Sequence, residues 1–179
     1  MRVDELVGYL KHLYKRDPKT PIILLGLPEI EMDEIVRKCA KELARELGRE
    51  FIRYTNDVAQ RVLETPSKYF LLVDFELPWL TAVHLIGIFH PNRGFYPMSW
   101  ACCLSATGGI LFFNKITEGC LESVLLTVYK IMLDRKVGEI PINDNTLIIA
   151  AGGLPEDFET VYPLPTPLLN RCKVIRVEP

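Results

Sequence analysis

Hydrophobic and polar positions follow two different periods along this chain. In some segments apolar residues recur every three or four positions, as on one face of an α-helix, whereas other segments are short apolar runs typical of buried strands. The helical spacing predicts helices over residues 3–14, 33–47, 57–64, 79–85, 98–105, 118–134 and 166–171. The apolar runs predict strands at residues 22–25, 51–54, 69–75, 110–113, 146–151 and 174–177.

The order of these elements predicts an α/β fold. Because strands alternate with helices, the strands are expected to form a parallel sheet with both faces covered. Residues 80–109 form the irregular part, in which Gly87, Pro91, Gly94 and Pro97 punctuate the chain. We predict a hairpin-like excursion between two short helices there.

Composition and charge narrow the class of protein. The 179 residues are 49% hydrophobic and 25% charged, which is ordinary for one globular domain, so we expect a single domain over residues 1–179. A formal net charge of −2 without a basic run disfavours nucleic-acid binding. The acidic N-terminus is unlike a signal peptide, and no apolar stretch is long enough to cross a membrane. We therefore expect a cytoplasmic protein that does not bind membranes.

The cysteines indicate packing instead of crosslinks or metal binding. There are five, an odd number, with no C-x-x-C pair and no histidine at ligand spacing: Cys39, Cys102, Cys103, Cys120 and Cys172. We expect buried free thiols and no metal site. The adjacent Cys102 and Cys103 could oxidise, although core packing is the favoured interpretation.

Residues 21–35 have the rhythm of a strand, a turn and a helix that cradles phosphates. A loop of the type G-x-x-x-x-G-K-[ST] uses glycines to curl its N–H groups around phosphate, a lysine for charge and a hydroxyl for magnesium. Gly26 fits the first glycine, but Glu31 occupies the second glycine position, Met32 the lysine position and Asp33 the hydroxyl position. The scaffold of a nucleotide site is present without its chemistry.

Several segments along the chain resemble the core of MoxR-like AAA+ ATPases, and they follow one another in the same order as in that family. They are residues 21–28, 35–43, 84–91, 109–116, 147–155, 161–165 and 168–171. The resemblance implies a three-layer α/β sandwich of P-loop NTPase type with a five-stranded parallel sheet of order 5-1-4-3-2. The family continues into a helical lid after the last strand, and we expect this lid to be absent because the sequence stops at Pro179.

The charges of the phosphate-loop region oppose nucleotide binding. A carboxylate about 4 Å from a phosphate costs on the order of 4 kcal/mol at an effective dielectric constant of about 20. Glu29, Glu31 and Asp33 together would exceed the roughly 8 kcal/mol of a micromolar affinity. A second interpretation is structural, because acids at a helix N-terminus interact favourably with its dipole. In either case we expect no cofactor.

The other catalytic positions implied by the resemblance are also replaced. Asn114 stands at the metal-organising aspartate, Lys115 at the water-activating glutamate and Gly153 at the polar sensor residue. We expect Lys115 to pair with Glu29, Glu31 or Asp33; the alternative is a solvated strand end. Asp74 and Glu76 are not expected to rescue catalysis, since the family order places their strand at the sheet edge, far from the loop.

Two features point to interactions with other proteins. Arg171 stands where the family has its arginine finger, which acts on a neighbouring subunit, although an arginine near a helix C-terminus is also favoured by the dipole. Phe95, Tyr96 and Trp100, in the irregular segment, are candidates for an exposed partner-binding surface.

The function expected from the sequence is therefore a catalytically inactive AAA+-like interaction or regulatory module. The expected partner is an active AAA+ subunit or a von Willebrand A-type protein, and the module is expected to be a monomer or a weak oligomer. The alternatives are a structural or scaffolding protein of a mobile element and, less favoured, a residual ATPase.

Overall fold

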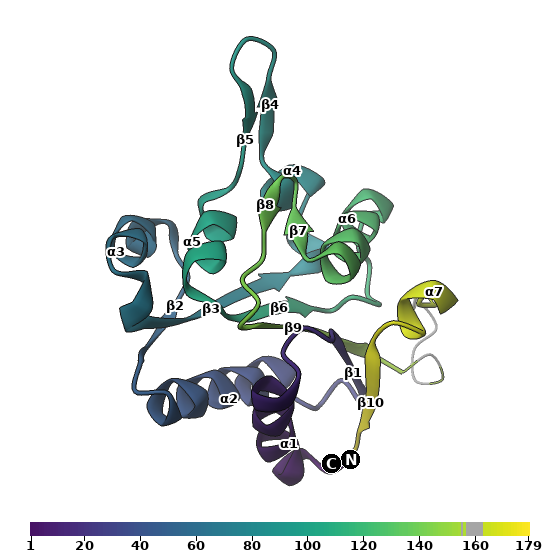
Figure 1. The fold of residues 1–179 in the computed structure, drawn as a ribbon. Helices are drawn as coiled ribbons and strands as arrows, with labels where there is room; N and C mark the ends of the chain where they lie inside the picture. The colour runs from purple at the N-terminus through teal and green to yellow at the C-terminus, as the bar shows by residue number, and fades with distance from the viewer. Residues whose placement is uncertain (155, 157–162) are drawn as a thin grey trace.

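A parallel six-stranded sheet organises the fold (Figure 1). The computed structural model describes residues 1–154, 156 and 163–179. The sheet has the order β10-β1-β9-β6-β3-β2, and every neighbouring pair is parallel. Its strands are β1 (Ile22–Gly26), β2 (Glu50–Arg53), β3 (Tyr69–Glu76), β6 (Gly109–Asn114), β9 (Thr146–Gly153) and β10 (Lys173–Val177). The apolar runs predicted all six.

The five-stranded sheet implied by the family resemblance is wrong by one strand. The extra strand is β2, which pairs with β3 from Glu50 opposite Tyr69 to Arg53 opposite Leu72. Strand β3 is therefore not at the edge, because β6 lies on its other side. The pairing of β3 with β6 brings Glu76, at the end of β3, beside Asn114, at the end of β6.

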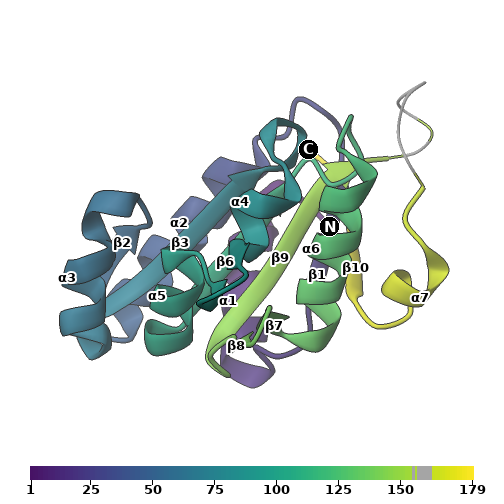
Figure 2. The same cartoon turned by 90° about the horizontal axis from the view of Figure 1, so that it is seen from above.

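Helices cover both faces of the sheet, as the alternating pattern predicts (Figures 1 and 2). One face carries α1 (Val3–Arg16) and α2 (Met32–Glu46), and the other carries α3 (Ala59–Glu64), α4 (Ala82–Ile86), α5 (Ser99–Thr107) and α6 (Glu122–Asp134). Short 3-10 turns are η1 (Asn56–Val58), η2 (Pro66–Lys68) and η3 (Leu77–Trp79), and α7 (Thr166–Leu169) precedes β10. Helix α6 begins four residues later than predicted.

The central strands contribute side chains to two separate cores. Successive residues of a strand point to opposite faces, so Ile22 and Leu24 pack under α1 and α2 while Ile23 packs on the other side. In the same way Phe112 belongs to the first core and Phe113 to the second. This double burial explains why these strands are apolar at every position instead of at alternate ones.

Two hairpins interrupt the alternation of helices and strands. Strands β4 (Ile88–His90) and β5 (Gly94–Tyr96) form the predicted hairpin, which projects from the body of the molecule (Figure 1). A second, shorter hairpin of β7 (Lys136–Val137) and β8 (Ile140–Pro141) was not predicted. Two-residue strands carry too little periodicity to be recognised.

All five cysteines are free thiols. Cys39, Cys103 and Cys120 are buried as expected, whereas Cys102 and Cys172 are half-buried. Burial raises the pKa of the Cys39 thiol to about 12 and those of Cys103 and Cys120 to about 11. Within the described ranges, none of the helices has the length and apolar character needed to cross a bilayer.

A charged cluster joins α1 to α2. The Lys11 ammonium donates to Glu42 Oε2 at 2.6 Å and to Glu46 Oε1 at 2.8 Å, and Lys15 also pairs with Glu46. The hydrogen bonds from Lys11 and Lys15 lower the pKa of the Glu46 carboxyl to about 2. The cluster therefore favours the folded state only while Glu46 is ionised.

This cluster predicts a pH-dependent stability. Because the folded-state pKa of Glu46 is depressed, its contribution is complete above the ordinary carboxyl pKa of about 4.3 and is lost as the pH falls toward about 2. In urea titrations, Glu46→Gln is expected to be less stable than the native chain at pH 7, and the difference is expected to shrink as the pH falls from 4.5 toward 3. Glu5→Gln, at an exposed carboxylate of α1, is the control. A difference between native chain and Glu46→Gln that does not change with pH would contradict the proposed role.

Candidate functional site

The predicted degenerate motif positions meet around one cavity at the carboxyl ends of the central strands. Its volume is about 380 Å³. It is lined by Gly26, Leu27, Pro28, Ile30, Glu31, Met32, Asp33, Glu76, Asn114, Lys115, Glu118, Gly152 and Gly153. Parallel strands end at the same edge of a sheet, which is why segments distant in sequence converge here. Glu29 does not line this cavity and is exposed on a neighbouring apolar groove.

Met32 fills the space where the phosphate-loop lysine would stand. It is the first residue of α2 and is only 6% exposed. Its terminal methyl carbon lies 2.7 Å from the position that a Cβ on Gly26 would occupy, so the thioether covers the glycine. An apolar side chain packed in this way offers no charge to a phosphate.

The loop backbone is also committed to internal hydrogen bonds. The Ile30 N–H donates to the Leu27 carbonyl at 3.1 Å, and the Met32 N–H donates to the Ile30 carbonyl at 2.9 Å. A phosphate-binding loop directs such N–H groups at the anion instead. Two potential phosphate donors are therefore occupied within the loop itself.

The acids of the loop lie at the start of α2. Glu31 is its N-cap residue and makes no side-chain capping hydrogen bond, whereas Asp33 lies in the first helical turn. Asp33 is 3.8 Å from the Arg37 guanidinium, which binds Glu34 more closely at 2.7 Å. The structural interpretation of these acids thus rests on the helix dipole and not on a direct cap.

Lys115 pairs with Glu76, which corrects the expectation that its partner would be Glu29, Glu31 or Asp33. The Lys115 Nζ atom is 3.2 Å from Glu76 Oε2. Asn114 Nδ2 donates to Glu76 Oε1 at 2.6 Å, and Asn114 Oδ1 accepts the Lys115 backbone N–H at 3.1 Å. The reason is register, because Glu76 of β3 lies directly opposite Asn114 of β6.

Glu76 is therefore a site residue that sequence reasoning rejected. The five-strand order already places this strand beside that of Asn114 and Lys115, so the error lay in weighing only its distance from the phosphate loop and not its neighbour in the sheet.

Thr117 occupies the space beside the sensor position. Its buried hydroxyl accepts the Gly153 N–H at 2.9 Å. A Cβ on Gly152 would lie 2.6 Å from the same Oγ1 atom, so glycine permits this close approach. Gly153 itself has no side chain with which to hold a water molecule. The role of Thr117 was not predicted from the sequence.

The electrostatic character of the cavity is acidic. Among the residues that the structure describes, four carboxylates line it, from Glu31, Asp33, Glu76 and Glu118, and Lys115 is the one cation. The Lys115 ammonium is already paired with Glu76. A triphosphate would meet an excess of negative charge here, whereas the phosphate sites of NTPases supply positive charge.

Arg171 is exposed and does not line the cavity of its own chain. It follows α7, which lies beside β10 at the edge of the sheet, and its N–H donates to the Leu168 carbonyl at 3.1 Å (Figure 2). Residues 155, 161 and 162, which belong to segments that resemble the family, lie outside the described residues. Because Arg171 does not line the cavity of its own chain, its expected action on the site of a neighbouring subunit stays a prediction.

Two of the three residues predicted to form a partner surface are exposed, and their binding of a partner stays a prediction. Phe95 is 37% and Tyr96 48% exposed. Trp100, by contrast, is 1% exposed, which corrects its assignment to this surface. It lies in the first turn of α5, which packs on the sheet, and its ring meets Phe75 edge to face at a centroid distance of 5.1 Å.

Four exposed apolar residues of the same region were missed. Together with Phe95 and Tyr96 they make up what we call the hairpin surface: Trp79, Val83, Ile88, Phe89, Phe95 and Tyr96. The missed residues lie in η3, α4 and β4. Apolar residues in short elements are usually buried, so the sequence favoured the opposite expectation.

Comparisons with known proteins support the fold and not the activity. No protein-family model matches the chain, and no curated protein matches its sequence. Among solved structures, a protein assigned as an ATPase from Cytophaga hutchinsonii has a TM-score of 0.55 and 17% identity, covering 98% of this chain and 49% of that one. NtrX from Brucella abortus has a TM-score of 0.51 and 12% identity, covering 96% of this chain and 36% of that one.

These two solved proteins share the overall α/β fold of this chain. The chain spans about half, or less, of the length of the solved proteins it resembles. At such low identity the likeness extends to the fold alone.

Proposed function

We propose that this chain is a catalytically inactive, MoxR-like AAA+ domain that acts as a protein-interaction or regulatory module. The observation that carries the proposal is the lining of the phosphate-loop cavity. Met32 covers Gly26, and among the described lining residues carboxylates outnumber the single lysine. Each of these features opposes the binding of a nucleoside triphosphate.

The positions for hydrolysis support the same proposal. The family binds magnesium through a carboxylate at the position of Asn114. The amide of Asn114 is a weaker ligand than a carboxylate for this hard cation. Lys115 offers an ammonium, paired with Glu76, where a general base is required. Neither side chain can perform the step that its position serves in the family.

The hairpin surface supports the interaction role. Large exposed apolar patches often mark protein–protein interaction sites, and the β4–β5 hairpin carries exposed Ile88, Phe89, Phe95 and Tyr96. By resemblance, the partner is proposed to be an active AAA+ subunit or a von Willebrand A-type protein, with Arg171 available to a neighbouring site.

Nucleotide binding is tested most directly by thermal unfolding. A ligand present at about 100 times its Kd stabilises the native state by about 2.7 kcal/mol. For a chain of this size that energy raises Tm by about 5–10 °C. We expect no shift with millimolar Mg-ATP or Mg-ADP.

Two controls make the result specific. An AAA+ ATPase with an intact phosphate loop must show the shift under the same conditions, and Mg²⁺ alone separates effects of the cation from those of the nucleotide. A rise of Tm with Mg-ATP that Mg²⁺ alone does not reproduce would refute the proposal.

A further inference from the structure

An apolar groove lies beside the phosphate-loop cavity, where the loop after β1 meets the start of α1. It has a volume of about 410 Å³ and is lined by Val3, Glu29, Ile30, Glu31, Glu34, Ile35 and Pro179. Ile30 and Glu31 also line the phosphate-loop cavity, so the two hollows share a wall. Each volume lies in the range of about 300–1,000 Å³ that is usual for binding sites in proteins. A ligand that extends past Ile30 and Glu31 therefore contacts both.

The floor of the groove is apolar and is fixed by the core beneath it. Val3, Ile30 and Ile35 are half-buried and pack against the core that α1 and α2 form with the sheet. The two ends of the chain meet there (Figure 1). The Val3 N–H donates to the Glu178 carbonyl at 3.0 Å, and the Glu178 N–H donates to the Met1 carbonyl at 2.8 Å. A groove held by packing and backbone hydrogen bonds needs little rearrangement to accept an apolar partner.

The rim of the groove is acidic. Glu29 and Glu34 add two carboxylates to those of the phosphate-loop cavity, and Glu31 belongs to both hollows. Within the described part of the chain, which holds every lysine, arginine and histidine of the sequence, Glu29 and Glu31 form no ion pair. The nearby Arg37 is already bound to Glu34 at 2.7 Å, and Lys115 is bound by a carboxylate of the cavity. Negative charge without a counter-charge therefore borders an apolar floor.

This charge pattern selects among the classes of partner. The carboxylates repel the phosphates of a nucleic acid or of an anionic membrane. A two-fold contact between copies of the chain would set the same carboxylates against one another. Among the described residues, no three carboxylate, thiol or imidazole side chains are grouped so that they could hold a metal ion. The pattern fits a polypeptide that carries apolar and basic side chains together.

We propose that the apolar groove and the phosphate-loop cavity bind a basic amphipathic segment of a partner protein. Its apolar side chains contact Val3, Ile30 and Ile35, and a neighbouring lysine or arginine extends past Glu31 toward Asp33 in the cavity. The proposal rests on the proposed interaction role and deepens it by naming the chemistry of the partner. The carboxylates that oppose a triphosphate attract a cationic side chain.

Fluorescence anisotropy with a labelled model peptide tests this proposal. The probe is a peptide of about 12 residues with leucines on one side of a helical repeat and arginines beside them. We expect a Kd on the order of 10–100 µM at low salt. The Kd is expected to rise at least about tenfold between about 0.05 and about 0.5 M NaCl, because salt screens exposed charges.

Two further peptides separate the apolar from the charged contribution. Replacing the leucines by serines keeps the charge and is expected to raise the Kd at least about fivefold, since the apolar floor is then left in water. Replacing the arginines by glutamates keeps the apolar side and is expected to abolish binding, because like charges then face one another.

Variants of the chain locate the contact. Glu29→Gln combined with Glu31→Gln removes two exposed carboxylates of the rim and is expected to raise the Kd for the arginine–leucine peptide at least about fivefold. The matched control, Glu64→Gln combined with Glu139→Gln, removes the same charge from exposed residues that line neither hollow. It is expected to leave the Kd within about twofold, because distant charges are screened. Circular dichroism verifies that both variants are folded.

Three results would each overturn the proposal. The first is no binding of the arginine–leucine peptide up to about 1 mM. The second is equal binding of the arginine–serine peptide, which assigns the contact to charge alone. The third is an equal Kd for the two double variants, which places the contact elsewhere on the molecule, the hairpin surface included.

These results are separate from the nucleotide test. A rise of Tm with Mg-ATP would refute the inactive-domain proposal whether or not the peptide binds. A peptide that fails to bind would refute the basic-segment proposal and leave the nucleotide result intact.

Discussion

Replacing Trp100 by alanine is expected to lower the free energy of unfolding by about 3–5 kcal/mol. Its indole is 1% exposed and packs against Phe75, so truncation leaves a cavity between α5 and the sheet. A loss of this size is a large part of the 5–15 kcal/mol that stabilises a typical domain. Urea unfolding followed by circular dichroism measures it.

Two further variants separate packing from simple loss of an aromatic residue. Trp79→Ala, at a residue 81% exposed, is expected to change stability by less than about 0.5 kcal/mol. Trp100→Phe keeps an aromatic ring in the core and removes an indole N–H that has no hydrogen-bond partner among the described residues, so it is expected to cost less than Trp100→Ala. Equal losses for Trp79→Ala and Trp100→Ala would contradict the burial seen in the structure.

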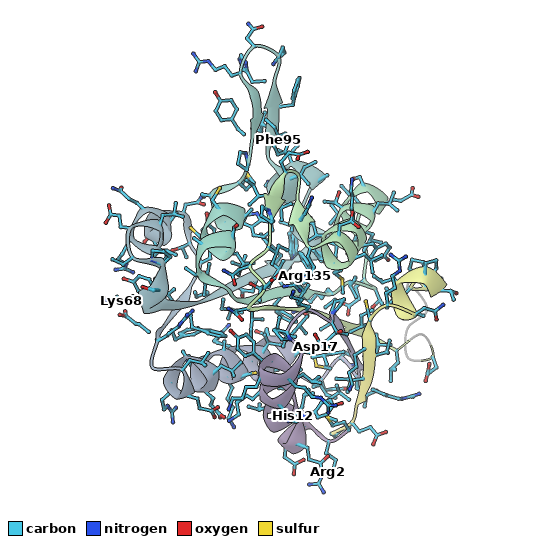
Figure 3. All side chains as sticks on the ribbon, viewed as in Figure 1. Arg2, His12, Asp17, Lys68, Phe95 and Arg135 are labelled. Carbon is cyan, nitrogen blue, oxygen red and sulfur yellow. The ribbon has the colours of Figure 1, made fainter. Side chains whose placement is uncertain are left out.

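The second large effect is expected at Arg135. Its guanidinium donates to the Thr146 carbonyl at 2.8 Å and to the Asn143 carbonyl at 3.0 Å, and it also reaches the Lys19 carbonyl at 3.2 Å. Burial lowers the pKa of Arg135 below its usual value. Figure 3 shows the residue in the middle of the molecule, where it joins the end of α6 to two other loops. Arg135→Ala is expected to cost about 3 kcal/mol, because buried carbonyls lose their donors.

Further variants separate the effect of the lost hydrogen bonds from that of the backbone conformation at Arg135. Arg135 has φ +53°, so Arg135→Gly relieves a left-handed backbone and is expected to be about 1 kcal/mol more stable than Arg135→Ala. Arg135→Lys is expected to be intermediate, since one ammonium cannot reach all of the carbonyls. Arg61→Ala, at an exposed arginine of α3, should be nearly neutral. Thermal unfolding in which Arg135→Ala and Arg61→Ala lower the Tm equally would contradict a stabilising role of the hydrogen bonds from Arg135 to the carbonyls.

The sheet was predictable because its strands are buried on both faces. A run such as Tyr69 to Val73 has no polar position, and only a strand covered by helices on either side accounts for it. The apolar run at residues 51–54 predicted β2, and the number of five strands came only from the family resemblance. The β7–β8 hairpin was missed because its two-residue strands carry too little periodicity.

The candidate site was predictable in position and not in contacts. The carboxyl ends of parallel strands must meet, so the loop after β1, Asn114, Lys115 and Gly153 were expected together, and the structure places them around one cavity. The predicted strand order already placed β3 beside β6. The partner of Lys115 depended instead on the residue register between these strands and on the direction of its side chain, which local sequence does not encode.

The sequence by itself determined the alternation of helices and strands, the strand-turn-helix start of the fold and the residue types at the carboxyl ends of the strands, where Met32, Lys115 and Gly153 stand. These are properties of residue type and spacing, which remain the same however the chain packs. The tertiary structure decided that Glu76 pairs with Lys115, that Met32 covers Gly26, and that Trp100 is buried while Trp79 is exposed. Those outcomes depend on which elements become neighbours, and burial and ion pairing are properties of neighbours in space, not in sequence.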